Sequence, residues 1–220
     1  MDATVRIRRI YVFRYGPLTR LNHWITAILF LLLAASGLSM WYPGLFWLSW
    51  IFNGGEGARW IHPYLGCALV ISFFSLAIQF VMNNLPTMDD VRWMWRIRTV
   101  VENRHGGLPE LGKFNAGQMM VYWSMVALIP ILLVSGIIIW QVYFGGWTSI
   151  PLQRIALLIH SLAAIIAITI IIVHIYSAFW TVGSGRAMTR GTVTGGFGYI
   201  HHRRWLRESL EKGLTRPGDD

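Results

Sequence analysis

Residues 155–182 read IALLIHSLAAIIAITIIIVHIYSAFWTV, and this stretch decides the fold. It contains no Asp, Glu, Lys or Arg. A helix needs about 20 mainly apolar residues to cross a bilayer. The apolar run is continuous rather than alternating, which favours a helix over a membrane strand. The stretch therefore predicts a transmembrane helix that carries two histidines, His160 and His174.

Three further windows without charged side chains lie upstream, and each is longer than a span needs. The first is too long for a cleaved signal peptide, and no small-residue cleavage site follows it. We therefore predict an all-α transmembrane four-helix bundle in a single membrane domain, residues 1–220, with spans near residues 21–41, 58–82, 114–140 and 153–182.

The composition supports a membrane protein. Of the 220 residues, 55% are hydrophobic and 13% charged, whereas soluble domains carry about 25% charge. This balance excludes a disordered segment and an ordinary soluble enzyme. The single cysteine, Cys67, excludes a disulfide scaffold and a cysteine-held iron–sulfur cluster within the chain.

The net charge of +9 indicates the orientation. Seventeen of the 19 basic residues fall in three segments outside the spans, residues 1–20, 83–113 and 183–220. Cytoplasmic segments of membrane proteins carry the excess of Lys and Arg. Both termini and the middle loop are therefore predicted to be cytoplasmic. Topology and contact with anionic lipid account for these charges, and we predict no nucleic-acid binding.

Four histidines lie within the predicted spans, where ionisable residues are rare and usually functional. His160 and His174 are 14 residues apart. An α-helix places them about 21 Å apart along its axis and only about 40° apart around it. His62 matches His160 in depth near the outer face, and His23 matches His174 near the cytoplasm. The topology thus predicts one histidine pair in each leaflet.

Two imidazoles that face each other across a helical bundle suit the axial ligation of haem b. Zinc is less favoured because it usually takes more protein ligands. A proton relay would not require pairs at two depths, and any one histidine could be a hydrogen-bonded interfacial residue. We predict two haems b, with His62 and His160 on the outer iron and His23 and His174 on the inner one.

The two halves of the chain share a faint pattern, which indicates either a parallel repeat or chance. Gly37 follows His23 by 14 residues, so it reaches the level of the outer pair. A missing side chain there would leave room for a flat macrocycle or serve ordinary helix packing. The matching elements are Trp24, Ser36-Gly37, Trp41 and Ile61-His62 in the first half, and Trp123, Ser135-Gly136, Trp140 and Ile159-His160 in the second.

The start of the third span is polar. Asn115 and Gln118 are three residues apart, so both can point to one side of a helix at the cytoplasmic border. An amide there can bond a quinone carbonyl, and Gly117 would let the ring approach closely. The alternative is an ordinary helix start with Asn115 as its N-cap.

At these residues the sequence resembles the gamma subunit of membrane-bound respiratory formate dehydrogenase, a b-type cytochrome. The histidine spacing alone is also similar to that of hydrogenase b-type cytochromes. The resemblance runs over roughly residues 8–210 and rests on Leu21-Asn22-His23-Trp24, Ile61-His62-Pro63-Tyr64-Leu65-Gly66, Gly112 to Gln118, Ser135 to Trp140, Leu157 to His160, His174-Ile175-Tyr176, Ala178-Phe179-Trp180, His201-His202 and Arg204-Trp205.

The resemblance implies an electron-transfer subunit in the bacterial inner membrane, with the four span histidines as haem ligands. It implies that an iron–sulfur beta subunit, fed by a molybdenum- or tungsten-containing catalytic alpha subunit, delivers electrons through the two haems to menaquinone or ubiquinone. Formate would be oxidised on that partner and not here, and a higher oligomer of the heterotrimer is compatible with the resemblance. The implied quinone site comprises Asn115, Gly117, Gln118 and His174.

One segment departs from the family, because residues 191–198 are rich in Gly and Thr where a more charged tail is expected. Rival interpretations remain open. A cytochrome b subunit of a hydrogenase or of a thiosulfate or polysulfide reductase would keep the haems and change the partners. A proton-coupled transporter or a bare membrane anchor would bind no haem.

Overall fold

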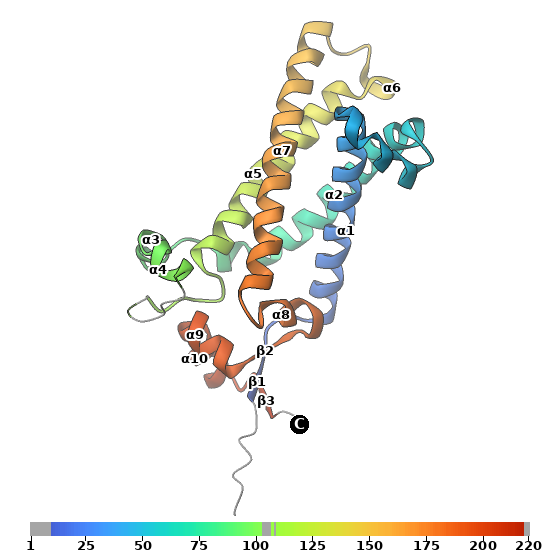
Figure 1. Cartoon of the computed structure of the whole chain (residues 1–220). Coiled ribbons are helices and arrows are strands. Elements are labelled where there is room, and N and C mark those ends of the chain that lie inside the picture. The colour runs from blue at the N-terminus through green and yellow to red at the C-terminus, as the bar shows by residue number, and fades with distance from the viewer. Residues whose placement is uncertain (1–9, 103–106, 108, 218–220) are drawn as a thin grey trace, which may run out of the picture. The chain divides into compact units, whose positions relative to one another are not determined.

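The computed structural model describes residues 10–102, 107 and 109–217 of the chain. Its four long apolar helices are α1 (Pro17–Trp41), α2 (Gly55–Phe80), α5 (Ala116–Ile139) and α7 (Ile150–Trp180) (Figure 1). A short 3-10 helix, η2 (Val81–Asn84), extends α2. Each of the four is long and apolar enough to cross a membrane, so the predicted four-helix membrane architecture is confirmed. The extent of the membrane domain stays a prediction.

Residues 21–79 and 121–173 form one compact unit, built from the four long helices. Its core contains Leu69 of α2, Met125 and Ile129 of α5, and Ala167 of α7. Small side chains at buried positions of a membrane helix allow close approach of its neighbours, as Ala167 does here. Many large side chains face outward instead, Leu158 being 71% exposed. These apolar surfaces suit contact with lipid.

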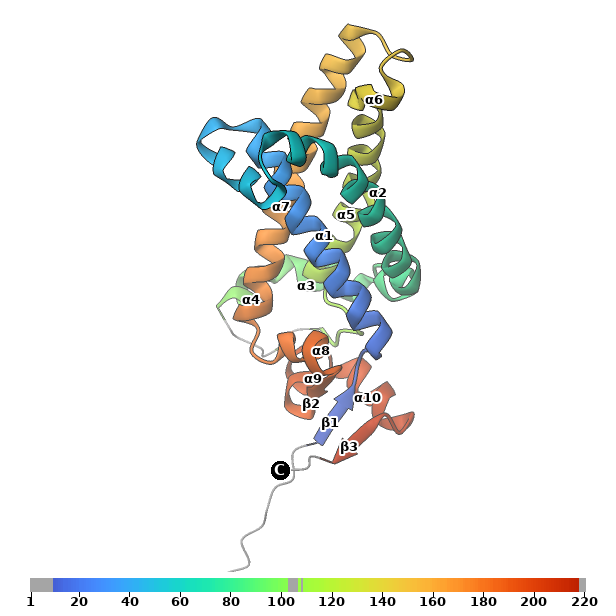
Figure 2. The same cartoon turned by 90° about the vertical axis from the view of Figure 1, so that its right-hand side faces the viewer.

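Two short helices in the same unit join the long ones. A 3-10 helix, η1 (Pro43–Phe52), follows α1, and α6 (Gln141–Phe144) lies between α5 and α7 (Figure 2). Trp47 and Trp50 of η1 are largely exposed. Tryptophan is enriched at the membrane–water interface, so η1 has the composition of an interfacial segment.

The second compact unit contains the described residues of 10–20, 80–120 and 174–217. A small antiparallel sheet places β1 (Ile10–Phe13) between its two partner strands, with Val12 opposite Val193 on one side and Thr215 on the other. The partner strands and the short helices of this unit are β2 (Thr192–Thr194), β3 (Thr215–Pro217), α3 (Met88–Trp95), α4 (Ile97–Val101), α8 (Ser184–Arg190), α9 (Gly195–His201) and α10 (Arg203–Glu211).

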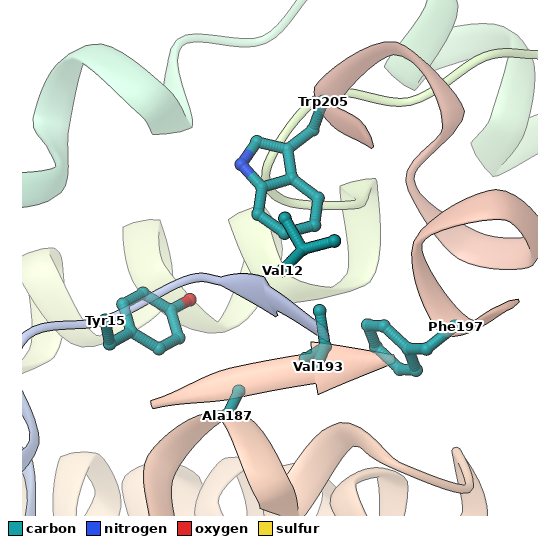
Figure 3. Close-up of a cluster of buried hydrophobic side chains, with 6 residues drawn as sticks. All are labelled: Val12, Tyr15, Ala187, Val193, Phe197 and Trp205. Carbon is teal, nitrogen blue, oxygen red and sulfur yellow. The ribbon is translucent and has the colours of Figure 1, made fainter. Parts of the chain in front are cut away.

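A hydrophobic cluster holds this sheet against the helices (Figure 3). Val12 and Val193 are completely buried between the strands and the flanking side chains. The cluster comprises Val12, Tyr15, Ala187, Val193, Phe197 and Trp205. The basic segments that the sequence analysis placed outside the spans thus fold together, apart from Arg6, Arg8, Arg9 and Arg104, which lie outside the described residues.

The Gly- and Thr-rich segment 191–198 is part of this ordered structure. Thr192–Thr194 form β2, and Thr194 is the N-cap of α9. The backbone N–H of Phe197 donates to the Thr194 hydroxyl at 3.2 Å. This segment therefore uses its small and β-branched residues for a tight strand-to-helix connection, which explains why it lacks the charged residues expected of a solvated tail.

Candidate functional site

Two of the four span histidines come together within the helical unit. His62 lies in α2 and His160 in α7, and their imidazole centroids are 6.2 Å apart with the rings inclined at 66°. The two residues are nearly 100 positions apart in the chain, and the packing of the long helices brings their rings close together.

A serine from a neighbouring helix contacts each of these rings. Ser36 of α1 places its Oγ 2.7 Å from His62 Nδ1. Ser135 of α5 places its Oγ 3.0 Å from His160 Nδ1. A ring whose Nδ1 is held by a hydrogen bond presents Nε2 as its metal-ligating nitrogen. Both histidines are thus engaged at the same nitrogen.

The glycine that follows each serine makes room for the same ring. A Cβ on Gly37 would lie 3.3 Å from His62 Cε1, and a Cβ on Gly136 would lie 3.4 Å from His160 Cε1. These distances are at the tight end of carbon–carbon contact. From its spacing, Gly37 was predicted to make room for a macrocycle or to serve helix packing. The described contact is with the histidine ring itself.

The geometry of the pair fits a haem iron. Metal–imidazole bonds are about 2 Å long and each ring centroid lies roughly 1 Å behind its nitrogen, so two opposed axial rings have centroids roughly 6 Å apart. The observed 6.2 Å matches this spacing. Two histidines with engaged Nδ1 atoms would be a suitable donor set for a haem b with two protein ligands.

The two histidines of the proposed inner pair lie in different compact units. His23 of α1 belongs to the unit that holds the outer pair, whereas His174, near the end of α7, belongs to the other unit. Their pairing stays a prediction. Under the repeat, Tyr122 of α5 occupies the position of His23, and its hydroxyl donates to the Ala77 carbonyl of α2 at 2.8 Å. In the second half, this position therefore links α5 to α2.

The polar start of α5 forms a reciprocal capping box. The Gln118 backbone N–H donates to Asn115 Oδ1 at 2.9 Å, and the Asn115 backbone N–H donates to Gln118 Oε1 at 3.0 Å. This is the helix-start alternative of the sequence analysis. The two bonds engage only the amide oxygens, so the Asn115 and Gln118 NH₂ groups are not consumed by the cap.

Gly117 lies in the first turn of α5, beside the cap. A Cβ there would lie 3.4 Å from Asn115 Oδ1 and 3.9 Å from Trp93 Cη2. Trp93 of α3 is buried and packs with Leu111 and Ala116. The first turn of α5 is therefore flanked by an aromatic ring, and the side of Gly117 is lined by Asn115 Oδ1 and the Trp93 ring.

Buried basic groups hold the chain just before this turn. His202 Nδ1 bonds the Gly112 carbonyl at 2.8 Å, and Arg14 Nη2 donates to the Lys113 carbonyl. The Arg14 guanidinium lies 4.6 Å from the Trp205 ring centroid. Burial, with a smaller contribution from Arg14, lowers the pKa of Lys113 to about 8. Burial likewise lowers the pKa of His202 well below its usual value, and Arg14 adds to the effect.

A comparison with protein families decides the assignment, because the model of the prokaryotic cytochrome b561 family matches residues 14–191. The chain belongs to this family. Membership of a cytochrome b family indicates that it binds haem b, and with four apolar helices it is a multi-pass membrane protein of the bacterial inner membrane type.

Curated relatives of this cytochrome b cover nearly the whole chain. It is 42% identical over 201 residues to the formate dehydrogenase cytochrome b556(fdo) subunit of Escherichia coli K12, covering 91% of this chain and 94% of the relative. Identity is 38% to the nitrate-inducible formate dehydrogenase cytochrome b556(Fdn) subunit of the same strain, with 90% of both chains covered. It is 37% to the formate dehydrogenase cytochrome b556 subunit of Haemophilus influenzae, covering 90% of this chain and 84% of the relative.

The contacts of Ser36 and Ser135 with the histidine rings were not predicted from the sequence. The signal was present, because Ser-Gly recurs in the first and third spans at matching positions. The two halves repeat the same serine–histidine contact, which supports a structural repeat over chance.

Proposed function

We propose that this cytochrome b is the membrane subunit of a formate dehydrogenase complex and carries electrons to quinone through two bis-histidine haems. The observation that carries the proposal is the His62–His160 pair, whose 6.2 Å centroid spacing suits an iron between the rings. The relatives named as formate dehydrogenase subunits, at 37–42% identity, support the choice of complex.

His62 and His160 are the proposed axial ligands near the outer face, and His23 and His174 those near the cytoplasm. Haem b supplies reversible one-electron chemistry when it is bound. The chain contributes the four imidazoles and apolar walls such as Leu69 and Ile129, which exclude water from the bundle.

The proposed quinone site comprises the first turn of α5 and His174. The Asn115 and Gln118 NH₂ groups are the proposed donors to a quinone carbonyl, with Gly117 admitting the ring. The excess of basic residues in segments 1–20, 83–113 and 183–220 supports a cytoplasmic position. Quinone reduction at this site would draw its protons from the cytoplasm. Menaquinone and ubiquinone share the carbonyl that these donors would bind.

The complex requires partners for formate chemistry. We propose an iron–sulfur beta subunit that delivers electrons and a molybdenum- or tungsten-containing alpha subunit that oxidises formate. An affinity-tagged chain, solubilised in mild detergent, should co-purify with both and show haem reduction on addition of formate. Co-purification with a hydrogenase or with a thiosulfate or polysulfide reductase, together with no haem reduction by formate, is the opposite result. It would contradict the assignment of the chain to a formate dehydrogenase complex.

Asn115→Ser tests the quinone site because serine keeps the N-cap and removes the amide donor. Loss of one neutral hydrogen bond of about 1 kcal/mol predicts haem reoxidation by quinone about fivefold slower, with haem content unchanged. Rapid mixing of the reduced complex with a soluble quinone measures the rate. The control is Asn83→Ser, the same change at an exposed position of the same unit. Normal reoxidation in Asn115→Ser would remove this amide from the site.

A further inference from the structure

We propose that Ser36 and Ser135 are positioning residues that fix the protonation form and the orientation of the two outer haem ligands and lower the potential of that haem. The inference deepens the proposed function and rests on a haem held by His62 and His160. It concerns the hydrogen bonds in which the hydroxyls of these serines accept from the imidazole N–H groups.

The direction of each bond follows from the carbonyls around the hydroxyl. Ser36 Oγ lies 2.9 Å from the Leu32 carbonyl and 3.1 Å from the Leu33 carbonyl. A carbonyl only accepts, and a serine hydroxyl has one proton to give. That proton is directed to the helix backbone, so the bond between Ser36 and His62 must be donated by Nδ1–H.

Ser135 repeats this arrangement in the second half. Its Oγ lies 2.6 Å from the Ile131 carbonyl and 3.3 Å from the Leu132 carbonyl, which again use the hydroxyl proton. His160 Nδ1–H therefore donates to Ser135 Oγ at 3.0 Å. In both halves the serine fixes the tautomer that carries its proton on Nδ1 and leaves the lone pair on Nε2 for iron.

Burial makes the two serines difficult to replace. Ser36 is completely buried and Ser135 is 4% exposed. Each hydroxyl is shielded from solvent, so its removal takes away the acceptor of the imidazole proton, and an unsatisfied buried donor is costly. Gly37 and Gly136, the residues that follow the serines, lie against the Cε1 edges of His62 and His160. Each Ser-Gly pair thus holds one ligand ring by a hydrogen bond on one edge and by shape on another.

The bond also affects the cofactor. An acceptor at the far nitrogen raises the basicity of a ligating imidazole. A more basic ligand favours the oxidised iron, so these serines hold the outer haem at a lower potential than free imidazoles would. Removal of the hydroxyl is expected to raise that potential.

The test compares Ser36→Ala and Ser135→Ala with wild type in the purified complex, by potentiometric titration of the haem absorbance and by low-spin EPR. Each variant should shift the outer haem to a more positive midpoint potential and change its EPR g-values, with the inner haem unchanged. Haem affinity should fall roughly tenfold or more. Ser36→Thr, which keeps a hydroxyl, should restore the wild-type potential.

The matched control is Ser39→Ala. Ser39 is buried on the same helix, one turn from Ser36, and donates to the Ser36 carbonyl at 2.7 Å rather than to a histidine. It should leave both potentials unchanged. If Ser36→Ala loses the outer haem, recovery in Ser36→Thr supports the hydroxyl, and loss in both variants overturns the inference. Wild-type potential and EPR in both alanine variants also overturn it.

The proposed function has a separate readout in the same experiment. If His62→Ala retains the outer haem, the ligand assignment fails. If His62→Ala loses that haem while the two serine variants match wild type, only the positioning role fails.

Discussion

His160→Ala is expected to remove the outer haem and leave the inner one. Alanine supplies no ligand. The His160 ring centroid lies 6.2 Å from that of His62, and no other described side chain is shown to take its place. The haem-to-protein ratio should fall from two to one, measured as the pyridine haemochrome of the purified chain. Exposed apolar helix faces are unaffected by the change, so membrane insertion should persist.

The companion variants make this expectation specific. His62→Ala should lose the same haem, and the double variant should lose no more than either single one, because both ligands serve one iron. His201→Ala, a histidine of α9 outside the spans, is the control and should keep both haems. Retention of both low-spin haems in His160→Ala would show that the outer pair is wrongly assigned.

His174→Ala is expected to remove the inner haem and to stop electron delivery to quinone. The remaining outer haem should still be reduced by formate in the intact complex, because its ligands are untouched. Its reoxidation by added quinone should fall to the background rate, since the haem proposed to pass electrons to the quinone is gone. Stopped-flow absorbance at the haem α band measures both phases.

His23→Ala should reproduce this behaviour if His23 and His174 share an iron. The Tyr122→Phe variant provides a contrast, because Tyr122 occupies the repeat position of His23 and its hydroxyl bonds a backbone carbonyl. It should keep both haems. An inner haem that survives in His174→Ala but not in His23→Ala would break the proposed inner pair.

Much of the fold was predictable from the sequence. Long windows without charge identify four spans because the bilayer sets both their length and their polarity. The depth of His62 and His160 in those spans was sufficient to pair them. The sequence could not show that the rings would be held by Ser36 and Ser135, because a serine inside a span more often bonds its own helix backbone.

The small sheet was missed for a different reason. Its strands are three or four residues long, too short to show the alternation that predicts a strand. Val12 pairs with Val193, which lies at the other end of the chain, so no local pattern could indicate the contact. The N-cap role of Asn115 was foreseen as an alternative, whereas the reciprocal bond from Gln118 was not. The side-chain bonds of this capping box are compatible with the proposed quinone role because they use only the amide oxygens.

We propose that this chain holds two haems b, each between two histidines. A reductive titration of the purified protein, followed at the haem α band together with the haem-to-protein ratio, tests it most directly. We predict two haems b per chain that titrate as two separate low-spin components. A single haem per chain, or a purified and folded protein with no haem absorbance, would contradict the account.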